Sequence, residues 1–251
     1  MLASLALTRE AYYERYRFAD VWAPVERAPR HVVRDLARIP GVRTAADRIV
    51  GTALVDVPGM MEPAHGKLVS IPADGPPPLN AFALVSGRLP DPRRPAEALL
   101  DADFAEAHGL APGDRLAAVV HGRRQDLLVV GTAMSPEFTY VLAPGEVAPD
   151  PRRAGVLWMS RAALEAAYDL DGAFNEAVLA LRPDAREAAV LAAVDRVLAR
   201  YGGTGAYGRD AQVSDRAQGE TRPSPPRRAR RRRRRGRPAA GQRSGCRGGR
   251  K

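Results

Sequence analysis

The first 216 residues alternate between two spacings of apolar side chains, one typical of helices and one typical of strands. Residues 2–18 have the helical spacing, and residues 18–24 are predicted to form a first strand. A second helix is predicted to open at residues 28–29 and to end at Pro40-Gly41, because proline and glycine commonly follow a helix C-terminus. The apolar face of this helix would consist of Val32, Val33, Leu36 and Ile39.

Residues 42–57 alternate between apolar and other side chains in their second half, which predicts a half-buried strand there. Residues 67–71 are predicted to form a short strand. This order of strand, helix, strand and strand indicates an α+β fold. Residues 72–96 are rich in proline and glycine but include a short apolar stretch at residues 82–85. We therefore expect an ordered crossing between two subdomains rather than a disordered linker.

The middle of the chain predicts a short helix followed by a β-hairpin. Asp103 and Glu106 have the spacing of a capping box, in which each side chain can satisfy a backbone N–H of the first helical turn. Gly109 would end that helix. Residues 111–114 are predicted to form a turn, and residues 116–120 and 127–130 are predicted to pair around Gly122.

The last third alternates strand and helix. Residues 156–159 and 175–181 are predicted strands, and Ser160 is predicted to cap a helix that reaches Tyr168. Asp184 and Glu187 have the spacing of a second capping box, and the helix they open should stop at Gly202-Gly203. The expected fold is therefore α+β, with mixed sheets and βαβ units in two subdomains.

The segment from Ala217 onward has a different composition. It contains no Val, Ile, Leu, Met, Phe, Trp or Tyr, so it cannot bury enough apolar surface to offset its chain entropy and is predicted to be disordered. It carries 14 Lys and Arg residues and one acid, whereas residues 1–216 carry 25 basic and 28 acidic residues. The formal net charge of +10 therefore comes from this tail. The expected organisation is a helix at 1–18, a core domain at 19–216 and a disordered tail at 217–251.

The single cysteine, Cys246, lies in the tail, so the core has neither a disulfide framework nor a cysteine metal site. No apolar run reaches the roughly 18 residues that a membrane span needs. The first seven residues are apolar but lack the basic region and cleavage site of a signal peptide. The helix at 1–18 is either an ordinary surface helix or a stalk that emerges from a membrane.

Candidate chemical sites are weak. None of the four histidines, His31, His65, His108 and His121, pairs with another at a metal-ligand spacing. Residues 203–208 match GxGxxG, but they follow a helix instead of a strand, which disfavours a nucleotide site. The acidic pairs Asp101 with Asp103 and Asp169 with Asp171 fit capping and turn positions. No catalytic residues, cofactor or metal site are predicted, and the chain is not expected to be an enzyme.

The arginine run at residues 230–235 leaves a second function open. Such runs bind phosphates through counterion release, so residues 222–237 could serve a soluble nucleic-acid-binding protein. No aromatic residues are interleaved with the run, and the core that precedes it is acidic. A nucleic-acid partner is therefore disfavoured. This alternative predicts steeply salt-dependent binding that disappears when the tail is removed.

Several stretches, in their order along the chain, resemble the extracytoplasmic core domain of ABC-transporter permeases of the MacB/FtsX class. Residues 8–22 resemble the family's exit from its first membrane helix, and Ala107–Leu116 with Leu128–Gly131 resemble its helix, turn and hairpin. The other matching stretches are Ile39–Val42, Val156–Ser160 and Gly172–Asn175. The likeness covers nearly all of residues 1–216.

The resemblance implies a non-catalytic domain inserted between the first and second membrane helices of a permease, on the extracytoplasmic side of the bacterial inner membrane. Such permeases work with a separate cytoplasmic ATPase and, in some members, with a periplasmic adaptor. The domain would couple ATP-driven helix motion to the handling of substrate or partner. The sequence departs from the family where a helix should continue from about Gln212 into a second span. We therefore expect a truncated product whose tail is read out of frame.

Overall fold

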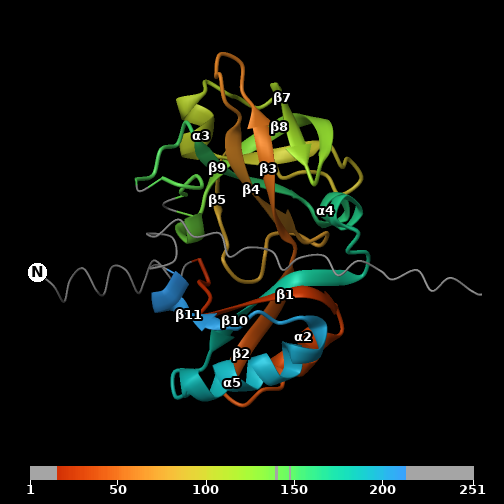
Figure 1. The fold of residues 1–251 in the computed structure, drawn as a ribbon, viewed down its shortest axis with the longest axis vertical. Helices are drawn as coiled ribbons and strands as arrows, with labels where there is room; N and C mark the ends of the chain where they lie inside the picture. Colours follow the sequence, from red (N-terminus) through yellow and green to blue (C-terminus); the bar gives the residue numbers. More distant parts are fainter. Residues whose placement is uncertain (1–15, 139–140, 147, 213–251) are drawn as a thin grey trace, which may run out of the picture. The chain divides into compact units, whose positions relative to one another are not determined.

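The computed structural model describes residues 16–138, 141–146 and 148–212. Every described residue belongs to one unit of the chain, residues 1–220. These residues form an α+β fold with one four-stranded and one seven-stranded sheet (Figure 1). Most of the predicted stalk helix and all of the predicted tail lie outside the described residues, and Tyr16 and Arg17 form a turn.

The four-stranded sheet has the order β11-β1-β10-β2, and all of its neighbouring strands are antiparallel. Its strands are β1 (Val21–Pro29), β2 (Val42–Arg48), β10 (Ala173–Leu181) and β11 (Tyr207–Gly208). Helix α2 (Val32–Ala37) connects β1 to β2, and helix α5 (Glu187–Leu198) with the 3-10 turn η2 (Ala199–Tyr201) connects β10 to β11. Each connection therefore skips one strand, which gives two split βαβ units in a ferredoxin-like order.

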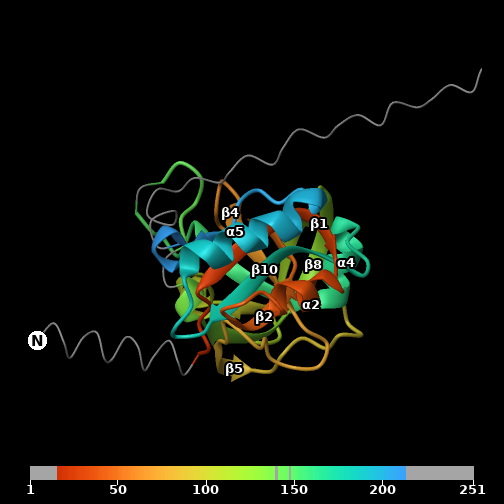
Figure 2. The same cartoon turned by 90° about the horizontal axis from the view of Figure 1, so that it is seen from below.

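The two faces of this sheet bury different sets of side chains. Helices α2 and α5 cover one face, as Figure 2 shows from below. The core under them includes Val21, Val32, Leu36, Leu179, Val190 and Val194. The opposite face carries Phe18, Trp22, Leu79, Val178 and Ala180. Because neighbouring residues of a strand point to opposite faces, the near-continuous apolar run of β10 serves both cores.

The seven-stranded sheet has the order β5-β8-β6-β9-β4-β3-β7, and a further pairing between β8 and β7 closes six of its strands into a barrel. Its strands are β3 (Val50–Asp56), β4 (Ala64–Ile71), β5 (Ala83–Gly87), β6 (Glu97–Asp101), β7 (Arg115–Val120), β8 (Arg123–Met134) and β9 (Ala154–Ser160). Strands β4 and β9 are parallel, as are β6 and β8, and the remaining pairs are antiparallel.

The largest core of the protein belongs to the closed strands and two helices. Helices α3 (Ala102–Ala107) and α4 (Arg161–Tyr168) contribute Phe104 and Leu164, both fully buried. The strands contribute Val55, Leu68, Leu100, Leu116, Leu127 and Leu157, among others. A smaller core on β4, β6 and β9 includes Val69, Leu99 and Trp158, and it packs against Phe138 in the 3-10 turn η1 (Pro136–Phe138).

The chain passes between the two sheets at places that the sequence did not predict. Residues 42–57 form two strands in different sheets, because the chain crosses over at the buried Ile49. Strands β9 and β10 also lie in different sheets, so the βαβ unit expected around α4 is wrong. The proline-rich stretch after β4 was expected to cross between subdomains, but it joins β4 to β5 within the seven-stranded sheet.

Several local predictions are confirmed and others need correction. The Oγ atom of Ser160 accepts a hydrogen bond from the N–H of Ala163, so the predicted cap of α4 is correct. The cap of α3 is Asp101 instead of Asp103, because the preceding residues form the unpredicted strand β6. The predicted capping box of α5 is wrong, since its N-cap position is Arg186 and no side chain caps it.

Candidate functional site

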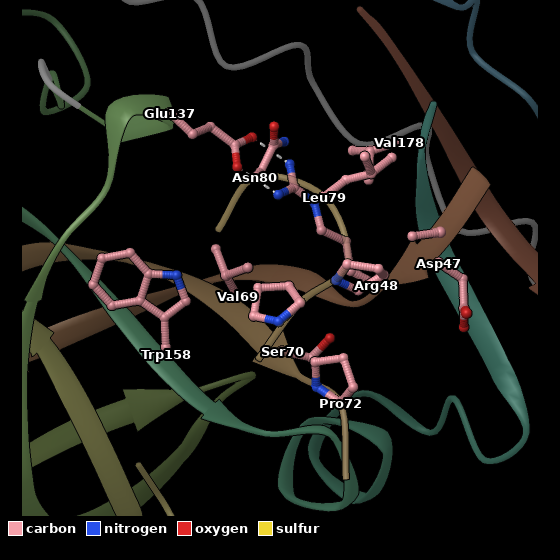
Figure 3. Close-up of a pocket in the computed structure, with 13 residues that line it drawn as sticks. Asp47, Arg48, Val69, Ser70, Pro72, Leu79, Asn80, Glu137, Trp158 and Val178 are labelled. Carbon is pink, nitrogen blue, oxygen red and sulfur yellow. Dashed lines mark hydrogen bonds and ion pairs between the residues drawn. The ribbon is translucent and has the colours of Figure 1, made fainter. Parts of the chain in front are cut away.

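A buried charge network joins the two sheets where β2 ends. The Arg48 guanidinium donates from Nε to Oε2 of Glu176 at 2.5 Å. It also donates from Nη1 and Nη2 to the two carboxylate oxygens of Glu137 at 2.6 Å and 2.5 Å, and Figure 3 shows this pair. The indole Nε1 of Trp22 donates to Oε1 of Glu137 at 2.9 Å. Arg48, Glu176 and Trp22 belong to the four-stranded sheet, whereas Glu137 follows β8 of the other sheet. The network therefore ties one sheet to the other.

The network is almost completely removed from solvent. The side chains of Arg48, Glu137 and Glu176 are 9%, 1% and 7% exposed. Burial alone would lower the pKa of Arg48, but the charges and hydrogen bonds of the two glutamates outweigh it and hold that pKa above its ordinary value. The guanidinium is therefore permanently charged. Because an unpaired buried charge costs several kcal/mol, removing any member should be strongly destabilising.

A second arginine binds the same strand from the other side of the junction. Arg161, the first residue of α4, forms an ion pair with Asp47 at 2.7 Å. It donates hydrogen bonds to Glu165 at 2.8 Å and to the backbone oxygen of Ala173 at 2.8 Å. Its side chain is 7% exposed. Asp47 and Arg48 are adjacent residues of β2, so their side chains leave the strand on opposite faces. The C-terminal end of β2 is therefore held by ion pairs on both faces of the sheet.

Two polar side chains add hydrogen bonds at the crossing point. The Asn175 amide accepts from the N–H of Val50 at 2.8 Å and donates to the oxygen of the same residue at 2.7 Å, as a neighbouring strand would. The Oγ atom of Ser70 accepts from the N–H of Ile49 at 2.9 Å. Asn175 lies in the four-stranded sheet and Ser70 in the other. The backbone at residues 49–50 is therefore held by both sheets.

The segment that leads into β1 is bound to the proline-rich stretch after β4. The oxygens of Tyr16 and Arg17 accept from the N–H groups of Ala81 and Asn80, both at 2.9 Å. The Oδ1 atom of Asn80 accepts from the N–H of Ala19 at 2.8 Å. Leu79 packs on the same face of the sheet as Trp22. This contact connects residues 16–19 to the region of the charge network.

The arrangement favours a mechanical role over a chemical one. Every charged member of the two networks is matched with an opposite charge, and such matched groups hold elements together instead of activating a nucleophile. Within the described residues, no group of three or more His, Cys, Asp or Glu side chains could hold a metal ion. None of the helices in this part of the chain is long and apolar enough to cross a membrane.

The four histidines lie on different elements, and none belongs to a group of three or more potential metal ligands among the described residues. His31 is exposed at the N-terminus of α2, and His65 lies half-buried within β4. His108 ends α3, where its ring packs at 4.6 Å from that of Phe104. His121 occupies the hairpin turn with φ of 46°, and its ring lies 4.9 Å from that of Tyr168.

The remaining candidates also have structural positions. Residues 203–208 follow η2 and end in β11, so the GxGxxG match contains the strand instead of lying between a strand and a helix. Asp169 ends α4 in a left-handed conformation, and Asp171 lies exposed in the following turn. Asp103 is exposed on α3, whereas burial raises the pKa of the capping Asp101 to about 6.

Sequence reasoning missed the charge network. A usable signal was present, because Glu176 interrupts an otherwise apolar strand and Glu137 lies between Pro136 and Phe138. Acidic residues in such contexts are seldom buried without a partner, which points to a matching arginine elsewhere. Which arginine it is depends on the sheet order, and that order was not predictable from the pattern.

No protein-family model matches the chain. No curated protein matches it. Similar solved structures include a periplasmic region, an extracellular domain of an ABC-type transporter and a domain of a putative permease.

One of these structures is the periplasmic region of MacB from Actinobacillus actinomycetemcomitans, which is 9% identical; the match covers 83% of this chain and 97% of that one, with a TM-score of 0.47. The extracellular domain of the noncanonic ABC-type transporter YknZ from Gram-positive bacteria is 11% identical, with coverages of 76% and 98% and a TM-score of 0.47. A domain of a putative permease from Porphyromonas gingivalis is 15% identical, with coverages of 74% and 84% and a TM-score of 0.41. All three TM-scores lie below 0.5.

Proposed function

We propose that this chain is the non-catalytic extracytoplasmic domain of an ABC-transporter permease, inserted between the first and second membrane helices. The observation that carries the proposal is the position of the first and last described segments, residues 16–20 and 207–212. Strand β1 pairs with β11, so that Val21 lies opposite Gly208 and Trp22 lies opposite Tyr207. Asp20 forms an ion pair with Arg209. The two segments are therefore neighbours.

This geometry suits a domain carried between two membrane helices. Adjacent strands lie about 4.8 Å apart, and packed helices lie about 8–10 Å apart, so the two segments could continue into neighbouring helices with little rearrangement. Residues 209–212 are already helical. The Arg209 guanidinium also lies 5.5 Å from the centre of the Phe18 ring, which adds a second contact between the segments. A movement of the membrane helix attached to one segment would therefore displace the other segment through these direct contacts.

The charge network supplies a route from these segments to the rest of the domain. Trp22 stacks on Tyr207 at 6.2 Å and meets Phe18 edge-on at 5.5 Å, while its Nε1 atom binds Glu137. Glu137 in turn holds Arg48 at the crossing between the sheets. We infer that the domain tilts as one body when its ends move, and that it presents this motion to substrate or partner. The expected partners are the rest of the permease, a separate cytoplasmic ATPase and, in some assemblies, a periplasmic adaptor.

The location can be tested with a single introduced cysteine. Met61 lies fully exposed in the turn between β3 and β4, and the natural Cys246 can be replaced by serine. In the membrane-bound permease, Met61→Cys should react with a membrane-impermeant maleimide in intact spheroplasts. The matched control is Leu68→Cys, which is fully buried and should react only after unfolding. Labelling of Met61→Cys only after the membrane is permeabilised would overturn the proposal.

The neighbouring genes give a second test. An ATP-binding-cassette ATPase should be encoded beside this chain, and it should copurify with the permease in detergent. A locus that encodes no such ATPase would argue against the proposal. Replacing residues 16–212 with an unrelated domain gives a further test. If the ATPase still copurifies and the permease keeps its activity, coupling does not pass through this domain.

A further inference from the structure

Asn80 carries a buried donor that is unpaired among the described residues. The residue is 5% exposed and has φ of 52°, a left-handed conformation that asparagine tolerates better than most residues. Its Oδ1 atom accepts from the N–H of Ala19, which fixes which end of the amide is oxygen. The Nδ2 atom is then a donor with no partner among the described residues. A buried unpaired donor costs about 1–3 kcal/mol, so a partner is expected.

The same amide lines a small cavity between the proline-rich stretch and the charge network. Leu79 and Asn80 form one side, Val69 and Trp158 form another, and Arg48 and Glu137 complete it (Figure 3). The space open to the centre of a water molecule is about 20 Å³. A single water needs roughly 10–15 Å³ by this measure, so the cavity has room for one water.

The charges around the cavity also select a neutral ligand. The nearby network contains one guanidinium and two carboxylates, Arg48 with Glu137 and Glu176. This negative balance disfavours an anion, and a bare cation could not accept the hydrogen bond that the Nδ2 atom of Asn80 offers. A water molecule accepts one hydrogen bond from such a donor and can give two of its own. It therefore matches both the size and the polarity of the cavity.

We propose that this cavity is a hydration site for one ordered water, which accepts from Nδ2 of Asn80 and donates toward the carboxylate of Glu137. The water would complete a chain of hydrogen bonds from Ala19 through Asn80 to the junction of the sheets. The role of this hydrogen-bond chain in transmitting motion rests on the proposed coupling function. The hydration itself is a property of the chain alone.

The test uses the chain in solution and needs no transport assay. We expect water-to-protein nuclear Overhauser effects at the Asn80 side-chain amide protons from a long-lived water, and one ordered water within about 3 Å of Nδ2 in crystals that diffract to 1.5 Å or so. A dry cavity, or a direct hydrogen bond from Nδ2 to a protein acceptor, would overturn the proposal.

A filling variant locates the water. Val69→Ile adds one methyl group to the cavity wall and should abolish the signal, and Val178→Ile does the same from the opposite sheet if the first variant does not fold. Val197→Ile makes the same chemical change on α5, away from the cavity, and should keep the signal. A signal that persists in both filling variants would show that the water lies elsewhere. A negative result for the hydration site would leave the cysteine-labelling test of the permease domain unaffected.

Discussion

Replacing Glu137 with glutamine removes one buried negative charge while keeping the size of the side chain. In the native protein both oxygens of Glu137 accept from Arg48, at 2.6 Å and 2.5 Å, and one also accepts from Trp22 at 2.9 Å. Glutamine offers one oxygen and one NH₂ group, so a donor would face the guanidinium. The guanidinium would keep only Glu176, at 2.5 Å, as a charged partner.

The expected cost follows from the burial of this pair. Breaking a buried ion pair by removing one partner costs about 3–5 kcal/mol. Because Glu176 remains beside Arg48 as a full opposite charge, we expect a cost at the lower end of this range, about 3 kcal/mol for Glu137→Gln. The free energy of unfolding is measured by urea denaturation, with the slope against urea checked for each variant. A cost of this size would lower the melting temperature by about 6–12 °C in a domain of this length.

A matched control separates burial from the loss of an ion pair in general. Asp56 and Arg124 form an exposed pair at 3.1 Å, with side chains 58% and 66% exposed. Asp56→Asn should cost less than about 1 kcal/mol, since exposed pairs contribute little. If Glu137→Gln costs no more than Asp56→Asn, the reasoning about the junction is refuted.

A triple variant tests whether the buried charges act as a unit. Replacing Arg48 by methionine together with Glu137→Gln and Glu176→Gln leaves no unpaired charge. Its cost should therefore be smaller than the sum of the three single costs. Additive costs would show that these residues contribute separately.

Three further predictions concern other parts of the fold. The Arg88 hydrogen bond holds the pKa of Glu97 at about 2, well below its ordinary 4.5. The stabilisation from the ionised Glu97 is complete above pH 4.5 and is lost as the pH falls through 2, so the native chain should lose about 2 kcal/mol of unfolding free energy, after allowance for the exposed arginine. Acid unfolding titrations should show this loss in the native chain but not in Glu97→Gln. Asn175→Leu removes both hydrogen bonds to Val50 and should speed hydrogen exchange at that amide by at least tenfold, as measured by NMR. Gly155→Ala would place a Cβ atom 2.5 Å from the phenylalanine ring of α3 and should cost about 1–3 kcal/mol in urea denaturation.

Each of these predictions has a clear contrary outcome. Parallel acid unfolding of the native chain and Glu97→Gln would mean that the glutamate is not held ionised. Unchanged exchange at Val50 in Asn175→Leu would mean that the amide side chain does not protect the crossing. A Gly155→Ala variant of native stability would mean that α3 can move away from β9 at little cost.

Local structure was predictable where it depends on a few neighbouring residues. The cap at Ser160, the glycine that follows α3 and the hairpin around Gly122 follow from turn and capping chemistry within three or four positions. The capping of α3 failed because Asp101 and Asp103 are both plausible caps. Only the unpredicted strand β6 decides between them, since it places Asp101 at the start of the helix.

Sheet membership was not predictable, because it depends on partners far away in the sequence. Only the second half of residues 42–57 has a strand pattern, yet the chain forms two strands there and changes sheets at Ile49. The charge network has the same origin. Arg48 meets Glu137 and Glu176 across separations of 89 and 128 residues, and nothing local to any of them identifies the others.

The four-stranded sheet has a consequence for the order in which the chain can assemble during synthesis. Its central strand β10 pairs with both β1 and β2, yet it is made more than 120 residues after them. Every strand of the closed barrel lies within residues 50–160, after β2 and before β10 in the chain. The barrel can therefore complete its strand pairing before β10 is available to pair with β1 and β2. Two unpaired strands would be exposed on the ribosome during that interval. A nascent chain that stalls before β10 would carry a finished barrel and an unfinished second sheet, which makes it a natural substrate for chaperones.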